Sequence, residues 1–378
     1  MKRIALAGIV TALITSATVS TAVIAEIFDP LHTPAAQASR AEQGLLIDIE
    51  QTVHRTFIVG DHGILLSQGI GESGWQQAMV PTSVLLTAIS VVDTKHIWAA
   101  GHQGALIRSS DGGESWQFML DGHQLLELEY EWLQEKQTAL EDAIENAEDE
   151  YEIEELEFAL DELFFHIGGA EIQFEVGPTK PFLDVHFFNR EVGLAVGAYG
   201  TILRTTDGGE SWQVMNDAID NIMGYHVNKL VEGPEQSLIL AGEAGLLARS
   251  DDLGETFEML DSPYHGSLFG AIFDAEERLW VHGLRGNLYV AEDGYSFQQV
   301  MVNTRYNLNG ATLLADGRLV FVGHAGVLAV VNPDSREVEL FNHPSGLPIS
   351  NLVQSAGNEL ILVGRAGVQT FALPAASH

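Results

Sequence analysis

The sequence predicts an all-β fold, a seven-bladed β-propeller of four-stranded blades that carries an α-helical insertion, and three features support it. A frame, G-x-x-G-x-[IL]-x-R-[ST]-x-D-G-G-E-S-W, occurs at residues 101–116 and again at 197–212. The G-x-x-G element recurs at fairly even steps, with its first glycines at Gly60, Gly101, Gly197, Gly242, Gly283, Gly323 and Gly364. Only the step from Gly101 to Gly197 is long, and it leaves room for an insertion of about 55 residues within a repeat architecture.

The N-terminal segment has the features of an export signal. Lys2 and Arg3 precede an apolar stretch over residues 4–24, and small side chains follow near Ala25. This pattern predicts a secretory signal peptide at residues 1–25. The stretch is also long enough to cross a bilayer, so an uncleaved anchor is the alternative. In both cases we expect the rest of the chain to leave the cytoplasm.

Residues 84–119 show how one repeat is expected to fold. The runs VLLTAISVV, HIWAAG, ALIRS and SWQFM are apolar or alternating, and clusters of Gly and Asp separate them. Such runs predict four short strands joined by tight turns. Four strands in about 40 residues make one propeller blade, so seven turns predict seven blades. We expect the aromatic residues at one position of the frame to pack between blades: Trp75, Trp116, Trp212, Phe257 and Phe297.

Ring closure is expected to need the N-terminal side of the chain. The last repeat lacks a fourth strand, because too few residues follow GVQTFALP. An open ring would leave exposed strand edges. We therefore expect EIFDPL, residues 26–31, to supply the missing strand. The propeller would then comprise residues 26–120, with the closing strand and blades one and two, and residues 182–378, with blades three to seven.

The insertion, residues 121–181, is expected to form an antiparallel helical hairpin. Apolar residues recur every seven positions from Leu126 to Ala147, and at three-four spacing from Ile153 to Ile167, as in coiled-coil seams. We place the turn near residues 146–150. Further aromatic residues exceed what a two-helix seam buries, so they either lie on blades two and three or contact a partner: Trp132, Tyr151, Phe158, Phe164 and Phe165.

The composition limits the partners that the chain can bind. The formal net charge is −35, and there is no cysteine. Nucleic acid is not expected as a partner, because phosphate contacts need Lys and Arg. Disulfides and thiolate metal sites are excluded, and we predict neither a metal nor a cofactor. The acidity itself is typical of a well-solvated surface.

The frame with RSSDGGESW and RTTDGGESW resembles the photosystem II stability/assembly factor family, whose members are secreted seven-bladed propellers with BNR or Asp-box repeats. The resemblance extends over residues 42–373 apart from the insertion, and the acidic hairpin departs from the photosynthetic pattern. It implies a non-enzymatic assembly factor that holds partner polypeptides. Non-photosynthetic relatives in Gram-negative bacteria imply a periplasmic protein that serves an envelope or inner-membrane complex, such as an exporter of the resistance-nodulation-division superfamily.

Two sets of side chains are candidates for binding, besides the aromatic residues of the insertion. The resemblance implies a binding patch of frame arginines, which here are Arg108, Arg204 and Arg249; the alternative is that each pairs with a nearby carboxylate. The G-x-x-G turns are expected to lie on the same face as the links between blades and the base of the hairpin. They display Asp61, His62, His102, Tyr199, Glu243, Arg285, His324 and Arg365.

A sialidase-like glycoside hydrolase is the alternative function, because such enzymes share the Asp box. They need three arginines on a substrate carboxylate, a Tyr nucleophile with its Glu, and an Asp acid. Their early Arg-Ile-Pro motif is absent from the sequence, and the number of predicted blades differs. Asp111 and Asp207 of the Asp boxes are expected to shape turns instead of acting in catalysis.

Overall fold

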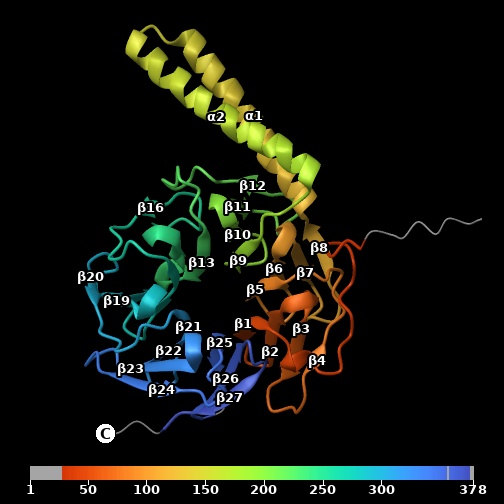
Figure 1. Cartoon of the computed structure of the whole chain (residues 1–378), viewed down its shortest axis with the longest axis vertical. Helices are drawn as coiled ribbons and strands as arrows, with labels where there is room; N and C mark the ends of the chain where they lie inside the picture. Colours follow the sequence, from red (N-terminus) through yellow and green to blue (C-terminus); the bar gives the residue numbers. More distant parts are fainter. Residues whose placement is uncertain (1–27, 356, 375–378) are drawn as a thin grey trace, which may run out of the picture.

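The computed structural model describes residues 28–355 and 357–374. Seven sheets stand around a central axis, and each is a meander in which sequential strands pair antiparallel (Figure 1). The innermost strands of successive sheets contact one another in chain order around the ring, and the innermost strand of the last sheet contacts that of the first. The seven-bladed propeller predicted from the sequence is confirmed.

The first four blades have four strands each. Blade one has β1 Leu46–Gln51, β2 Arg55–Gly60, β3 Leu65–Gly69 and β4 Gln76–Gln77, and blade two has β5 Leu86–Val91, β6 Ile97–Gly101, β7 Leu106–Ser109 and β8 Gln117–Leu120. Blade three has β9 Phe182–Phe187, β10 Gly193–Gly197, β11 Ile202–Thr205 and β12 Gln213–Val214. Blade four has β13 Val227–Glu232, β14 Leu238–Gly242, β15 Leu247–Ser250 and β16 Glu258–Met259.

The remaining three blades follow without interruption. Blade five has β17 Leu268–Phe273, β18 Leu279–Gly283, β19 Leu288–Ala291 and β20 Phe297–Gln299, and blade six has β21 Leu308–Leu313, β22 Leu319–Gly323, β23 Val327–Val331 and β24 Val338–Asn342. Blade seven has β25 Ile349–Gln354, β26 Glu359–Gly364 and β27 Gln369–Ala372. Within the described residues the seventh blade has only three strands.

Each G-x-x-G turn packs against the link that leads to the next blade. In six blades the turn is a short 3-10 helix whose residue before the second glycine has a positive φ, as at Tyr199 (φ 59°). The second glycine then meets the link at close range. A Cβ at Gly63 would lie 2.2 Å from the carbonyl oxygen of Thr82, and one at Gly245 would lie 2.1 Å from that of Tyr264. The turns and the links therefore share one face of the ring, as predicted.

The repeated aromatic residues pack between blades, as the sequence predicted. Trp116 joins residues of blades one and two in a buried cluster, and Trp212 does the same for blades two and three. Phe257 and Phe297 occupy the next two interfaces, and Trp75 lies between blades seven and one. Each aromatic side chain thus covers the interface between its own blade and the preceding one.

The predicted closing strand is wrong for the part of residues 26–31 that the structure describes. Pro30 accepts a hydrogen bond from the backbone N–H of Ser83, and Leu31 is buried against Val84 and Ala105. This segment therefore covers the link between blades one and two. The apolar side chain of Leu31 is buried there by residues that are far away in the sequence. Residues 1–27, which include the predicted signal peptide, lie outside the described residues.

Ring closure instead uses face-to-face packing of blade seven on blade one. Ile361 and Val363 of β26 lie in one cluster with Leu46, Ile58 and Leu66 of blade one. Nearby, the N–H of Val368 donates to the carbonyl of Glu42, and the Asn351 amide donates to the Asp48 carboxylate at 2.6 Å. No strand is shared across this junction in the described part of the chain.

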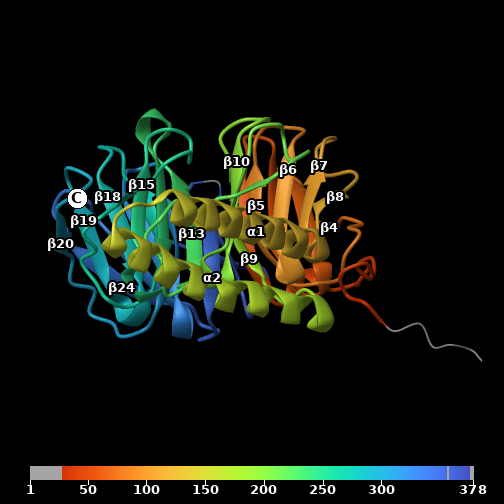
Figure 2. The same ribbon diagram turned by 90° about the horizontal axis from the view of Figure 1, so that it is seen from above.

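The insertion is a helical hairpin, as predicted, with α1 Gly122–Asn146 and α2 Glu150–Val176. Asp121 caps α1 in a capping box with Gln124, which satisfies free N–H groups of the first turn. Leu133, Leu163 and Ile167 are buried in the seam between the helices. The hairpin begins at the face of the G-x-x-G turns, where Gly122 abuts Gln103 of the turn, and projects outward beyond the rim of the ring (Figures 1 and 2).

Replacing a turn glycine by alanine tests the turn-to-link contact. Gly245 (φ +85°) faces the link, whereas Gly317 (φ +86°) has no atom within 4 Å of a Cβ. We expect Gly245→Ala to lower the free energy of unfolding by about 1–3 kcal/mol more than Gly317→Ala, because only the former adds overpacking to backbone strain. Chemical denaturation of both variants measures the difference. Equal losses in the two variants would contradict the role of this contact.

Candidate functional site

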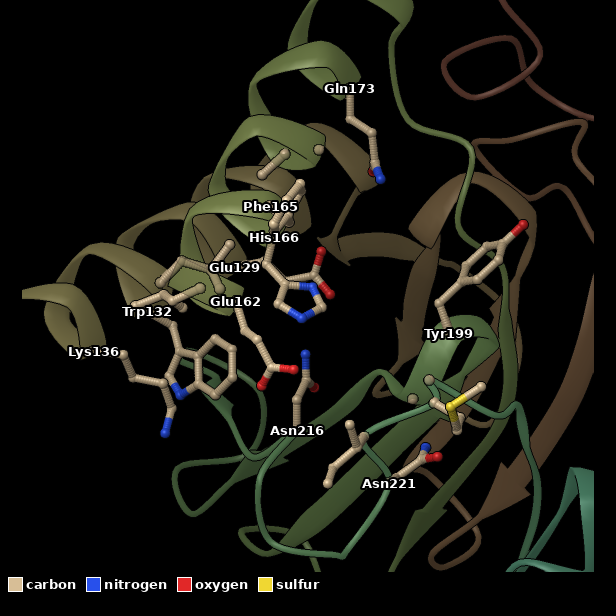
Figure 3. A pocket seen from close by; sticks show the side chains of 18 of the residues that line it. Glu129, Trp132, Lys136, Glu162, Phe165, His166, Gln173, Tyr199, Asn216 and Asn221 are labelled. Atoms are coloured by element: carbon tan, nitrogen blue, oxygen red, sulfur yellow. The ribbon is translucent and has the colours of Figure 1, made fainter. Parts of the chain in front are cut away.

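A cavity of about 840 Å³ forms a groove between the helical hairpin and blade three. One wall is formed by both helices, and the other by the Tyr199 turn and the link of residues 215–226 between blades three and four. Glu162 and His166 point from α2 toward Asn216 of the link, and Tyr199 lies on the far side of the opening (Figure 3). The ion pair between Lys136 of α1 and Asp217 joins the two walls.

The base of the hairpin is fixed to the propeller by a buried carboxylate. Glu129 of α1 is only 5% exposed, and it accepts hydrogen bonds from Lys180 at 2.7 Å and from Thr201 at 3.2 Å. Leu125 is buried in the same cluster as Phe182 of blade three. The start of the hairpin therefore belongs to the propeller core, and the position of the hairpin wall is set by blade three.

The five aromatic residues singled out in the insertion fall into two groups. Trp132 is half-buried, packs against the core of blades two and three, and has Lys136 above its ring at 4.8 Å. The other four are exposed, with exposed fractions from 48% to 83%: Tyr151, Phe158, Phe164 and Phe165. Of the two alternatives, packing on the blades or exposure to a partner, only Trp132 therefore shows packing on the blades. Phe165 also lines the groove.

Sequence reasoning missed the opposite wall of the groove. Ile222 and Met223 are 83% and 73% exposed, although both are large and apolar, and they line the groove together with Gly224. They lie in a link whose length and composition carried no repeat signal. The unusual pair of apolar residues between Asn221 and Gly224 was the one available indication.

The predicted turn residues are distributed over the whole ring. Asp61 and His62 form a contact at 3.0 Å in blade one, while His102 lies one blade further, where burial lowers its pKa. The other turn residues belong to blades three to seven, and of the full set only Tyr199 lines the groove: Asp61, His62, His102, Tyr199, Glu243, Arg285, His324 and Arg365. Within the described ranges no three His, Asp or Glu side chains are placed to hold a metal ion.

The three frame arginines contact the Asp-box turn of the next blade or their own turn. Arg108 donates to the carbonyl of Gly208 at 2.7 Å, and Arg204 donates to that of Leu253 at 3.1 Å. Arg249 pairs with Asp251 at 2.8 Å and lies over the ring of Tyr295 in blade five. These contacts give each arginine a role between blades. Their use as a binding patch stays a prediction.

The Asp boxes form local hydrogen-bond networks, as expected. Asp111 accepts from the hydroxyl and the N–H of Ser115 and from the hydroxyl of Ser109. The hydrogen bonds from Ser115 are the main cause of the lowered pKa of Asp111, which is about 2. Asp207 makes the same set of bonds with Ser211 and Thr205. Both carboxylates shape the turn between the third and fourth strands.

The central channel holds a second cavity, of about 320 Å³, lined by the inner strands of all seven blades. Lys229 lies between Asp184 at 2.9 Å and Asp48 at 3.6 Å, and these two carboxylates are almost fully buried. The side chain of Asp184 also accepts from the N–H of Leu230, while Glu50 accepts from the N–H of Val91. Burial raises the pKa of Glu50 to about 8. This network links inner strands of different blades.

Comparisons with known proteins agree with this architecture. Residues 170–265, which include blades three and four, match the family model described as photosynthesis system II assembly factor YCF48. The chain is a β-propeller similar to YCF48. No curated protein matches its sequence. The match confirms the resemblance expected from the DGGESW frame, and its range includes the second copy of that frame.

Solved structures show the same fold across the whole ring. YCF48 bound to a D1 peptide has a TM-score of 0.58 at 12% identity, with 92% of this chain and 98% of that chain covered. YCF48 from Cyanidioschyzon merolae has a TM-score of 0.57 at 12% identity, covering 87% and 95%. The WD40 propeller domain of Doa1 reaches 0.58 at 8% identity, covering 90% and 95%.

None of the described helices combines the length and the apolar character that crossing a bilayer requires. Both helices of the hairpin carry many carboxylates, and their apolar residues are interrupted at every turn.

The charge network of the channel predicts a fall in stability as the pH rises. Glu50 has a pKa of about 8 in the fold and about 4.5 when unfolded, so above pH 4.5 the folded state binds more protons. We expect the free energy of unfolding to decrease between about pH 4.5 and 8, and Glu50→Gln to flatten this decrease. Urea denaturation at several pH values measures it, with exposed Glu339→Gln as the control. An identical pH profile for wild type and Glu50→Gln would refute the assignment.

Proposed function

We propose that this chain is a non-catalytic scaffold that holds a partner protein in the groove between the helical hairpin and blade three. The observation that carries the proposal is that exposed apolar side chains line both walls of that groove. Phe165 of α2 faces it from one wall, and Ile222 and Met223 from the other. Exposed apolar clusters of this kind are typical of protein interaction sites.

The likeness to YCF48 supports a protein partner as opposed to a small molecule. One of the similar structures is described as bound to a D1 peptide, and the family is described as an assembly factor. We extend this to an assembly or stability factor for an envelope membrane complex. The apolar N-terminal stretch after Lys2 and Arg3 supports a periplasmic location. A resistance-nodulation-division exporter is the complex that the resemblance to Gram-negative relatives suggests.

The arrangement of the arginines favours a scaffold over a sialidase-like hydrolase. A hydrolase of that class needs three arginines on one substrate carboxylate. Arg108, Arg204 and Arg249 lie in three different blades, and each guanidinium is engaged with a turn carbonyl or a carboxylate of the protein. Because each guanidinium is held by a different turn, the three groups are poorly placed to converge on one sugar acid.

Removing the exposed aromatic side chains of α2 tests the proposed function. Phe158 and Phe165 are 64% and 83% exposed, so their loss leaves the core unchanged. We expect the double variant Phe158→Ser/Phe165→Ser to capture its envelope complex at least tenfold less well, because hot-spot aromatic residues dominate such interfaces. Affinity capture from solubilised envelopes, with mass-spectrometric identification of the components, measures this.

Val53→Ser provides the matched control, because Val53 is equally exposed at 83% but lies in blade one. The control should capture the same complex as wild type. Undiminished capture by the double variant, with both proteins folded by circular dichroism, would rule out the groove as the binding site.

A further inference from the structure

We propose that the occupant of the groove is a basic amphipathic helix of the partner protein, with an apolar face and Lys or Arg along its polar side. This inference rests on the proposed function and specifies the chemistry of the partner. Three features lead to it: the charges of the groove's walls, the spacing of the exposed apolar residues along α2, and the acidity of the hairpin.

The charges that line the groove leave a negative excess. Lys136 pairs with Asp217, and Lys180 pairs with the buried carboxylate of Glu129 at 2.7 Å. Both lysines of the lining are therefore neutralised by the protein itself. Glu162 points into the groove and has no ion-pair partner among residues 28–355 and 357–374 (Figure 3). The free charge that a ligand meets at this site is a carboxylate.

The surroundings add to this negative potential. Between residues 124 and 166 the hairpin has sixteen Asp and Glu and one Lys, and that Lys is the paired Lys136. The chain as a whole has a net charge of −35. Complementary charge steers association and discriminates against the wrong partner. A second copy of this chain would bring a second acidic hairpin to the same place, so self-association is disfavoured.

The apolar residues of α2 repeat as a helix-binding surface requires. Phe158, Phe165 and Ile172 follow one another at seven-residue steps and are 64%, 83% and 63% exposed. They form a stripe on the side of α2 that faces away from the seam residues Leu163 and Ile167. Phe165 lies both in this stripe and in the lining of the groove, and Glu162 lies beside the stripe, also in the lining. Fourteen residues of helix extend about 21 Å. An amphipathic helix of about four turns, with anchors at i, i+3, i+4 and i+7, matches this length.

Three designed peptides test the inference directly. All are 16-residue helices with one identical Leu/Phe face, and their polar face carries Lys, Gln or Glu. Fluorescence anisotropy with the full chain is the readout. We expect the Lys peptide to bind at least tenfold more tightly than the Gln peptide, and the Glu peptide more weakly than both. Raising the salt from 0.05 to 0.5 M should remove most of the difference, because screening weakens the charge contribution.

Point variants separate the groove from general attraction to an acidic protein. Glu162→Gln should weaken the Lys peptide about threefold to fivefold without changing the Gln peptide. Glu155→Gln is the matched control, because Glu155 lies on the same helix, is exposed, and does not line the groove. Ile222→Ser/Met223→Ser should weaken both peptides at least tenfold. Both side chains are largely exposed, so folding is unaffected.

Four outcomes would overturn the inference. The first is equal binding of the Lys, Gln and Glu peptides, and the second is an equal effect of Glu162→Gln and Glu155→Gln on binding of the Lys peptide. The third is a concentration-dependent dimer in sedimentation that Ile222→Ser/Met223→Ser abolishes. The fourth is groove-dependent binding of the protein to lipid vesicles in place of peptides. If capture of the envelope complex depends on Phe158 and Phe165 while the peptides show no preference for Lys, the scaffold function stands and only the basic helix is wrong. If neither depends on the groove, both proposals fail.

Discussion

The contact between each G-x-x-G turn and the following link is the constraint on which the ring depends. In five of the seven blades a Cβ on the second glycine would lie within 2.7 Å of the link backbone, so no side chain fits there, as at Gly245 beside Tyr264. The same contact closes the ring, because a Cβ at Gly367 in blade seven would lie 2.2 Å from the carbonyl of Glu42, just before β1. Blade seven thus uses the segment before blade one as its link. A shared strand is not required, since this contact and the Ile361 cluster hold the junction.

The same constraint explains where the hairpin could be inserted. Gly122 begins α1 where an ordinary link would begin, and it packs on the turn of Gln103 and Gly104 as other links do. The chain therefore completes the contact of blade two before it leaves the ring. On its return, Phe182 enters the core of blade three fully buried. An insertion that preserves both ends of a link leaves the neighbouring blades undisturbed, and this accounts for a long excursion in an otherwise regular repeat.

The sequence predicted the features that depend on local pattern, and it failed where distant residues meet. The spacing of the glycines predicted seven blades, and the apolar periodicity predicted both helices and their turn near residues 146–150. The sequence placed Leu31 in a closing strand of the last blade, and this was wrong because its neighbours Val84 and Ala105 are far away in the chain. Glu129 was indistinguishable from the other carboxylates of the hairpin until Lys180 and Thr201 were seen beside it. Ile222 and Met223 belong to no repeating pattern in the sequence, so pattern analysis did not identify them.

The way the groove is anchored bears on how it can bind. One wall is fixed through Glu129 and Leu125, and the other through the turn of Tyr199, whose positive φ of 59° and N–H bond to His226 hold it in place. Lys136 and Asp217 then set the separation of the walls. Because both walls of the groove are already held in place, the groove loses little conformational entropy when a partner binds. The exposed apolar residues add affinity there, and the surrounding carboxylates select among partners, because an acidic or neutral helix with the same apolar face would leave Glu162 desolvated without a counter-charge.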